Sequence, residues 1–315
     1  MKPPVVIIGS GLAGYTVARE FRKLDKSSSL LIITGDDGGF YSKPMLSNAF
    51  AQGKHAASLV SQSADQMAEQ LGAIILTHTQ VLDIRHADKL VVTSSGEFEF
   101  QQLVLAVGAQ AIRLPIKGDA ADQVLSVNNL KDYALLREKM QQTGTTAHVT
   151  ILGAGLIGCE FADDLTSGGH TVTLVDPNAT PLAALAPASI SQGLHNALEN
   201  KRIDLKLGTT ASSIDTDQQR LRVSLANGEH IVTDVVLSAV GLRPDIRLAN
   251  NAQLRTDRGI LVDQNGQTSA GGIFALGDCA QYTLADGSQC TLPYVAPLMS
   301  AARAIARSLC GELTP

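Results

Sequence analysis

The chain has 315 residues, of which 44% are hydrophobic and 28 are glycine, and its length and composition suggest a soluble α/β protein of two domains. A net charge of −5, 4% aromatic residues and no tryptophan argue against a nucleic-acid partner. No apolar run reaches the roughly 20 residues of a membrane-spanning helix and no signal peptide is evident, so we expect no membrane insertion and a cytoplasmic location.

The first predicted elements are a strand, a glycine turn and a helix, in the stretch "VVIIGSGLAGYTVARE" from Val5 to Glu20. In such a unit the first glycine makes the tight turn, the second lets the backbone approach a pyrophosphate, and the third packs the helix on the strand. The phosphates then lie against unpaired N–H groups at the helix N-terminus. This turn predicts a dinucleotide site formed by Gly9, Gly11, Leu12, Ala13 and Gly14.

The rest of the first half predicts more strands. "LLIITGDD", Leu30 to Asp37, is an apolar strand that ends near an acid, and Asp36 is either a ribose ligand or a solvated loop acid. Thr79 to Phe100 alternates like a β-meander, and "LVLAVGAQ" closes this half. The stretch from Ala111 to Thr146 contains a helix-like segment, and we place the first passage between domains there.

The second half repeats this plan. "VTILGAGLIG", Val149 to Gly158, is again a strand with a GxGxxG turn, and "TVTLVDPN" is again an apolar strand ending near an acid. A second meander spans Thr210 to Val232, and "VVLSAVGLRP" corresponds to the closing strand of the first half. Two such turns, each followed by an acid, are a strong signal. The second one predicts a site formed by Gly153, Gly155, Leu156, Ile157 and Gly158.

Asp176 is the predicted ribose ligand of the second site. It lies 23 residues after Gly153, close to the roughly 20 that separate the turn from this acid in dinucleotide-binding units. Its carboxylate would repel a 2′-phosphate, and no arginine follows it in "VDPNATP". The pattern therefore favours NADH over NADPH.

The chain finishes without a third repeat. "GIFALGDCAQ" predicts a strand with a glycine turn, and Tyr294 to Gly311 predicts a helix with Pro297 in its first turn. The four cysteines have no CxxC spacing and the seven histidines have no ligand spacing. We therefore expect free thiols, no disulfide framework and no metal site.

Together the two turns, "LVLAVGA", "SAVGLRP" and "IFALGDCAQ" resemble the FAD-dependent pyridine nucleotide-disulfide oxidoreductase-like family of flavoproteins. The resemblance covers nearly the whole chain. It implies two Rossmann-like domains of three-layer ββα type, with the NAD(P)H-binding domain, 116–241, inserted into an FAD-binding domain formed by 1–115 and 242–315. The small C-terminal interface domain of the family is expected to be absent.

Within the family, "YSKPMLS", "LGAGLIGCEFADDL" and "LPYVAPLM" are most similar to bacterial rubredoxin reductases. Related ferredoxin reductases have an arginine where Lys43 stands and a lysine where Asn48 stands. The resemblance implies FAD and NADH as cofactors and rubredoxin or a similar small iron protein as acceptor.

The resemblance also assigns site residues. Lys43 and Glu160 would flank the flavin as a pair, although Glu160 could instead be a solvated helix acid. Asp278 would bind the ribityl chain or else only cap a turn, and Arg113 would reach the pyrophosphate or else face solvent. The main chain at Val81 would receive the adenine, Val295 would face the flavin, and Gly241 would line the NAD site.

The expected function is electron transfer from NADH through flavin to rubredoxin, one electron at a time. No side chain is expected to act as a catalytic acid or base, because the flavin carries the chemistry. An NADH-dependent ferredoxin reductase shares every motif and is the nearest alternative. A flavin- and NAD-binding redox sensor or scaffold with slow turnover is an alternative from another class, and a flavin oxidase that reduces O₂ directly is a third.

Overall fold

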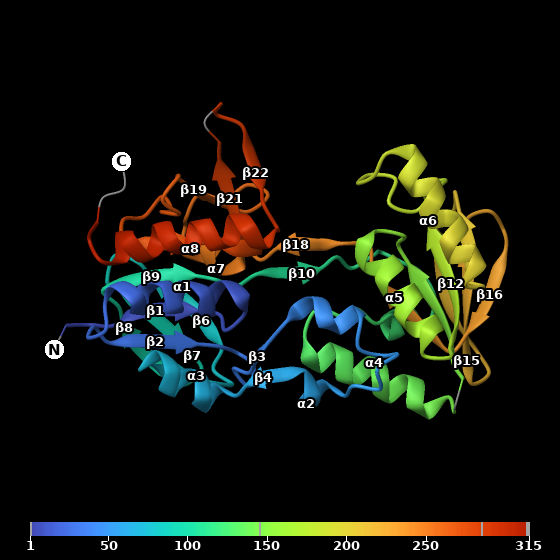
Figure 1. The fold of residues 1–315 in the computed structure, drawn as a ribbon, viewed down its shortest axis with the longest axis horizontal. Helices are drawn as coiled ribbons and strands as arrows, with labels where there is room; N and C mark the ends of the chain where they lie inside the picture. Colours follow the sequence, from blue (N-terminus) through green and yellow to red (C-terminus); the bar gives the residue numbers. More distant parts are fainter. Residues whose placement is uncertain (1, 145, 285, 313–315) are drawn as a thin grey trace. The chain divides into compact units, whose positions relative to one another are not determined.

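The computed structural model describes residues 2–144, 146–284 and 286–312. The chain divides into two compact units (Figure 1). The first comprises Met1–Tyr41, Val60–Gln110 and Arg243–Pro315, and the second comprises Ser42–Leu59 and Ala111–Leu242. The chain therefore enters the second unit twice, first with Ser42–Leu59 and then with Ala111–Leu242. The expected first segment of the FAD-binding domain, 1–115, includes Ser42–Leu59.

The first unit is built on a five-stranded parallel sheet in the order β20-β9-β1-β2-β5. Its remaining strands form a meander (β6-β7-β8), a second three-stranded sheet (β19-β21-β22) and the pair β3-β4. The elements are β1 (Val5–Ile8), α1 (Leu12–Leu24), β2 (Leu30–Ile33), β3 (Phe40–Tyr41), β4 (Val60–Gln62), α3 (Ala64–Leu71), β5 (Ile74–Leu76), β6 (Val81–Arg85), β7 (Leu90–Thr93), β8 (Gly96–Glu99), β9 (Gln102–Leu105), α7 (Arg247–Asn251), β19 (Ile260–Val262), β20 (Ile273–Ala275), η3 (Gly277–Cys279), β21 (Ala280–Thr283), β22 (Gln289–Thr291) and α8 (Val295–Leu309).

The core of the first unit has two halves, because successive side chains of β1 point to opposite faces of the sheet. Val5 and Ile7 pack against α1, α3 and α8, whereas Val6 and Ile8 pack against the meander and α7. Figure 1 shows α1 and α8 beside each other along the sheet, and they share an extensive contact. Both helices thereby bring their N-termini to the carboxyl end of the parallel strands, where open α/β sheets bind ligands.

The second unit has a four-stranded parallel sheet in the order β13-β12-β11-β17 and a meander of β14, β15 and β16. Its elements are η1 (Lys43–Ser47), α2 (Ala56–Leu59), η2 (Ala121–Gln123), α4 (Leu130–Gln142), β11 (His148–Leu152), α5 (Leu156–Ser167), β12 (Thr171–Asp176), α6 (Ala188–Asn200), β13 (Asp204–Leu207), β14 (Ala211–Asp217), β15 (Arg220–Leu225), β16 (His230–Thr233) and β17 (Val235–Ser238). Two further short strands, β10 (Ala109–Ala111) and β18 (Leu242–Pro244), pair where the chain passes between units.

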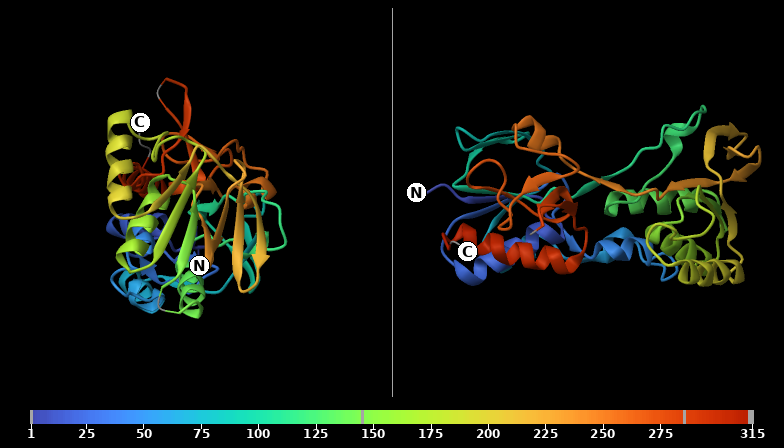
Figure 2. Two further views of the ribbon diagram at one scale, coloured as in Figure 1. Left: turned by 90° about the vertical axis from the view of Figure 1, so that its right-hand side faces the viewer. Right: turned by 90° about the horizontal axis from the view of Figure 1, so that it is seen from above.

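The second unit repeats the layering of the first. Leu152, Val175 and Val236 of the parallel strands pack against apolar side chains of the meander. The left view of Figure 2 shows this meander on one side of the parallel strands and the helices on the other. Both halves of the chain thus form a three-layer unit with a parallel sheet in the middle, as the internal repeat predicts.

Candidate functional site

The first glycine turn lies between β1 and α1 and allows no side chain at two of its three glycines. A Cβ on Gly9 would lie 2.3 Å from the Ala106 carbonyl oxygen, and a Cβ on Gly14 would lie 1.9 Å from the Gly9 carbonyl oxygen. A Cβ on Gly11 would meet no protein atom within 4 Å. Two glycines are therefore required by the fold itself, whereas the third leaves space open in front of the helix.

The N-terminus of α1 has the features of an anion site. Its N-cap residue is Gly11, with no side-chain cap, and its first turn holds no acidic residue. By contrast, α3 has a complete capping box in which Ser63 accepts from Gln66. The first N–H groups of a helix need partners, and a phosphate supplies them at a favourable end of the helix dipole. The predicted residues Leu12 and Ala13 lie in this first turn.

Asp36 lies beyond the end of β2 and is exposed. Its Oδ1 accepts hydrogen bonds from Thr34 Oγ1 at 2.6 Å, from Ser10 Oγ at 3.0 Å and from the Gly38 amide at 3.0 Å. These bonds occupy one carboxylate oxygen and orient the other. The hydroxyls of Ser10 and Thr34, which the sequence reasoning did not single out, therefore position this acid beside the turn.

A second helix terminus meets the same turn. Gly277 of η3 has φ +75°, and a Cβ there would lie 2.9 Å from Cβ of Ala13 and 3.7 Å from Cδ1 of Leu298 in α8. The turn that carries Asp278 is thus in close contact with the starts of α1 and α8. The α8 N-terminus has no side-chain cap, and its first residue, Val295, is 58% exposed. Asp278 itself is half-buried.

Val81, the predicted adenine contact, is the first residue of β6. It pairs with Thr93 of β7 and is half-buried. It therefore lies in the first unit with the glycine turn, Asp36 and Asp278.

The second glycine turn repeats the first in detail. A Cβ on Gly153 would lie 2.7 Å from the Ala239 carbonyl oxygen, and a Cβ on Gly158 would lie 1.9 Å from the Gly153 carbonyl oxygen. Gly155, the uncapped N-cap residue of α5, again has no protein atom within 4 Å of a Cβ. Leu156 and Ile157 follow in the first turn of α5 and are 56% and 40% exposed.

Asp176 is the last residue of β12 and is buried. Its Oδ2 accepts a hydrogen bond from the Ala154 amide at 2.7 Å, and its Oδ1 accepts from both the amide and the side chain of Asn178 at 2.8 Å. The carboxylate therefore binds the middle of the glycine turn directly. Because an ionised carboxylate has about four acceptor positions, a ribose hydroxyl could still be bound.

The strand registers show that the two acids are not equivalent. Ile8 lies opposite Ile33 in the first unit, and Leu152 lies opposite Val175 in the second. Thr34 therefore occupies the position of Asp176, and Asp36 the position of Asn178. Counting residues along the chain could not distinguish these positions, because strand pairing sets the equivalence.

Gly241 and Arg113 lie on the segments that enter and leave the second unit. Gly241 has φ +114°, and its carbonyl oxygen accepts a hydrogen bond from the Ile112 amide at 3.1 Å. Arg113 is exposed in the loop after β10. Both residues belong to the second unit, and their predicted cofactor contacts stay predictions.

Glu160 lies on α5 one turn after Leu156 and is half-buried. Its Oε2 accepts a hydrogen bond from the Ser47 hydroxyl at 2.6 Å. Ser47 closes η1, the short helix that begins with the exposed Lys43. The structure thus brings "YSKPMLS" to α5 through Ser47, a residue of this motif for which the sequence pattern predicts no role. The Lys43–Glu160 pair stays a prediction.

The four cysteines are free thiols. Cys159 and Cys279 are buried, and this burial is the main cause that raises the pKa of each thiol to about 11. Low-pKa, accessible thiols are the reactive ones, so neither residue is built for redox chemistry. Among the described residues, no group of three or more His, Cys, Asp or Glu side chains could hold a metal ion.

We expect Cys159 and Cys279 to resist alkylation in the native protein. At pH 8 a thiol with a pKa of about 11 is ionised in roughly one molecule in a thousand, and burial blocks access as well. Brief iodoacetamide treatment followed by peptide mass spectrometry should label the partly exposed Cys290 first. All four should react in guanidinium chloride; fast native labelling of Cys159 or Cys279 would contradict this assignment.

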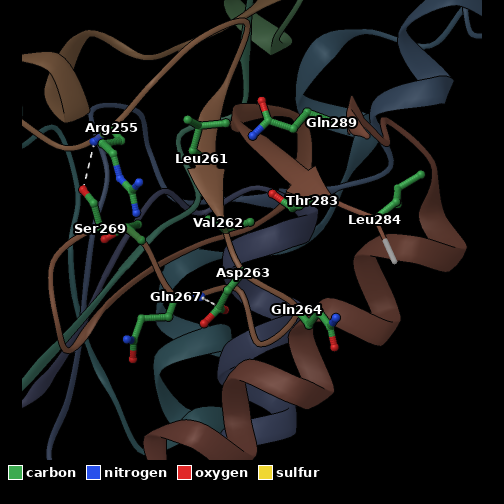
Figure 3. A pocket seen from close by; sticks show the side chains of 11 residues that line it. Arg255, Leu261, Val262, Asp263, Gln264, Gln267, Ser269, Thr283, Leu284 and Gln289 are labelled. Atoms are coloured by element: carbon green, nitrogen blue, oxygen red, sulfur yellow. Dashed lines mark hydrogen bonds between the residues drawn. The ribbon is translucent and has the colours of Figure 1, made fainter. Parts of the chain in front are cut away.

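A cavity of about 400 Å³ lies elsewhere in the first unit, beside β19, β21 and β22 (Figure 3). Amide and hydroxyl side chains such as Gln264, Gln289 and Thr283 line it, together with Arg255 and Leu261. None of the predicted site residues is among its lining residues.

Within the described residues, no helix combines the length and the apolar character that a membrane crossing requires.

Comparison with known proteins identifies relatives along the whole chain. The family described as "Pyridine nucleotide-disulphide oxidoreductase" matches residues 3–304. The "Rubredoxin-NAD(+) reductase" of Alcanivorax borkumensis is 44% identical over 312 residues, which are 99% of this chain and 80% of that protein. The chain thus spans about four fifths of the length of this curated relative.

Two solved structures share the fold. A putidaredoxin reductase, crystallised in covalent complex with putidaredoxin, has a TM-score of 0.90 and 28% identity, covering 99% of this chain and 76% of that one. A ferredoxin reductase for the CYP199A2 system of Rhodopseudomonas palustris has a TM-score of 0.91 and 28% identity, covering 100% of this chain and 78% of that one.

Proposed function

The chain belongs to the pyridine nucleotide-disulphide oxidoreductase family, and from this premise we propose that it passes electrons from NADH through FAD to rubredoxin or a similar small iron protein. Proteins of this family use FAD and NAD(H). The observation that carries the proposal is the pair of uncapped helix N-termini, each behind a glycine whose missing side chain leaves space for a phosphate. One chain with two such sites can bring two dinucleotides together.

The first unit has the groups that FAD requires. The α1 N-terminus at Gly11 would bind the pyrophosphate, Asp36 the adenosine side, and Asp278 the ribityl chain. The dipole of α8, which begins at Val295, would favour negative charge at its N-terminus. Bound FAD would supply the conversion between a two-electron donor and one-electron acceptors.

The second unit would bind NADH. The N-terminus of α5 at Gly155 would hold the pyrophosphate, and Asp176 would accept from the adenosine ribose. The buried carboxylate would repel a 2′-phosphate, so NADH is the proposed donor. We propose that 1–115 and 242–315 form the FAD-binding domain and that 116–241 forms the NADH-binding domain. Within this assignment, Ser42–Leu59 belongs to the FAD-binding part of the chain but packs in the second unit.

Protein groups would orient the reacting rings and hold water away, while no side chain needs to transfer a proton. Lys43 and Glu160 are proposed to flank the flavin, with Ser47 holding the Glu160 carboxylate. Because the four cysteines are free thiols without CxxC spacing, and two of them are buried with raised pKa values, electrons are proposed to leave directly to an external acceptor.

Rubredoxin is the favoured acceptor because the rubredoxin-NAD(+) reductase of Alcanivorax borkumensis is 44% identical to this chain. A ferredoxin-type acceptor is the second candidate, supported by the likeness to the Rhodopseudomonas palustris ferredoxin reductase. We propose a cytoplasmic location, which supplies NADH and keeps thiols reduced.

Anaerobic stopped-flow measurements test the proposal. NADH should bleach the flavin absorbance of the FAD-loaded protein much faster than NADPH, and rubredoxin should restore it rapidly. A ferredoxin mixed in place of rubredoxin identifies the second candidate if it reacts faster. Bleaching that persists against every protein acceptor would favour a redox sensor, and failure to bind FAD would overturn the proposal.

A further inference from the structure

The excursion Ser42–Leu59, here called the docking segment, attaches to one face of α5 at two points. Ser47 donates its hydroxyl hydrogen to Glu160. Three residues later, the amides of Phe50 and Ala51 donate to the two carboxylate oxygens of Asp164 at 2.7 and 3.1 Å. Glu160 and Asp164 are four residues apart and therefore lie one helical turn apart on the same face. The two acids align the docking segment along the helix.

The ring of Phe50 anchors the docking segment next to the Asp164 contact. The Arg137 guanidinium lies 4.5 Å from the ring centroid, and the rings of His170 and Tyr133 meet it edge-on at 5.4 and 6.2 Å. Tyr133 and Arg137 also donate to the Lys54 carbonyl oxygen, at 2.9 and 2.8 Å. The docking segment is therefore held by α4 as well, both at the Phe50 ring and at the Lys54 carbonyl oxygen.

The two attachment points differ in burial. Asp164 is 7% exposed, whereas Glu160 is only half-buried. Burial raises the pKa of the Asp164 carboxyl and costs free energy for its charged form, which the hydrogen bonds from the Phe50 and Ala51 amides offset. Such a buried acid serves to hold backbone in place, because its oxygens are engaged by the docking segment. The half-buried Glu160 is the end that can meet a ligand.

We propose that Asp164 is a positioning residue. By holding the Phe50 and Ala51 amides, it places the Ser47 hydroxyl against Glu160. It thereby fixes the orientation of the Glu160 carboxylate beside the flavin, which NADH reduces by hydride transfer. This inference rests on the proposed function, in which Glu160 flanks the flavin. Asp164 itself touches no reacting group in this assignment. Its influence passes along α5 and the docking segment, through the Ser47–Glu160 hydrogen bond.

The test compares Asp164→Asn with Asp163→Asn, its neighbour on α5. Asparagine keeps the shape of the aspartate, but its amide group would face one of the two backbone N–H donors. Asp163 pairs with Lys201 at the surface, so its variant removes the same charge without touching the docking segment. For Asp164→Asn we expect flavin reduction at saturating NADH to slow about 10- to 100-fold with little change in the apparent Kd for NADH. Asp163→Asn should behave like the wild type.

Hydrogen exchange provides a readout that does not depend on activity. Mass spectrometry should show faster amide exchange across residues 42–59 in Asp164→Asn, with exchange elsewhere in the second unit unchanged. Wild-type exchange in this segment would overturn the inference, and so would a wild-type rate of flavin reduction. If the wild-type protein is not reduced by NADH at all, the proposed function fails, while the exchange result still decides whether Asp164 holds the segment.

A double-mutant cycle with Ser47→Ala separates positioning from general loosening. If Asp164 acts through Ser47, then Asp164→Asn should slow flavin reduction by less than about twofold in the Ser47→Ala background. Independent effects that multiply would contradict the pathway. If Asp164→Asn does not fold, Tyr133→Phe provides a second variant, because it removes the hydrogen bond to the Lys54 carbonyl oxygen and keeps the aromatic ring. This variant should increase amide exchange in residues 42–59 and slow flavin reduction by about two- to fivefold. Unchanged exchange and an unchanged rate of flavin reduction would reject the proposal.

Discussion

Gly155→Ala is expected to raise the Kd for NADH at least tenfold while leaving the fold and the FAD content unchanged. The backbone of Gly155 is extended, a conformation open to any residue, and a Cβ there meets no protein atom within 4 Å. The added methyl group would instead occupy the space in front of the α5 N-terminus, where the pyrophosphate must approach. Titration of the FAD-loaded protein with NADH, and its thermal unfolding midpoint, measure both effects.

The matched variants of this prediction are in the same and in the other turn. Gly11→Ala should lower FAD affinity without disturbing the fold, since its Cβ also meets no protein atom within 4 Å, and NADH binding at the α5 turn should stay unchanged. Gly158→Ala should instead destabilise the second unit by about 1–3 kcal/mol, because its Cβ would lie 1.9 Å from a carbonyl oxygen. Gly193→Ala, on α6 with open space around it, should alter neither ligand. Wild-type NADH binding by Gly155→Ala would refute the assignment of this helix terminus.

Asp176→Ala is expected to lower kcat/KM for NADH about 100-fold and to raise the ratio of NADPH to NADH activity at least tenfold. The variant loses both the ribose acceptor and the charge that opposes a 2′-phosphate. It also leaves the Ala154 amide without the partner that holds the turn, so about 1–3 kcal/mol of stability should be lost with it. Steady-state kinetics with both coenzymes and a constant acceptor measure the ratio.

The control for this variant is Asn178→Ala. Asn178 donates to the same carboxylate from its side chain but does not supply the charge. Its variant should keep the preference for NADH and lose little activity. If Asp176→Ala retains the wild-type preference, the discrimination lies elsewhere in the second unit and Asp176 serves only to tie the turn.

Local patterns in the sequence predict most of the architecture because they report short-range constraints. Each GxGxxG turn has two glycines at which a Cβ would clash with a carbonyl oxygen, and the apolar runs Val5–Ile8 and Leu30–Ile33 are buried strands. The internal repeat predicts two similar three-layer units, since a strand, a tight turn and a helix specify their own packing. The absence of CxxC spacing likewise predicts free thiols without reference to the fold.

The contacts that complete the candidate site could not be predicted in this way, because they join residues that are distant in sequence. Ser47 and Glu160 are 113 residues apart, and Phe50 and Asp164 are 114 apart. No periodicity connects such positions, and a buried acid on a helix looks like a solvated one until its partners are known. The equivalence of Thr34 in the first unit and Asp176 in the second depends in the same way on strand register. Side-chain packing across the whole sheet decides this register. The sequence alone therefore determines the two turns and the elements around them, whereas the tertiary structure decides that Ser42–Leu59 packs in the second unit, because only folding brings its backbone amides to Asp164.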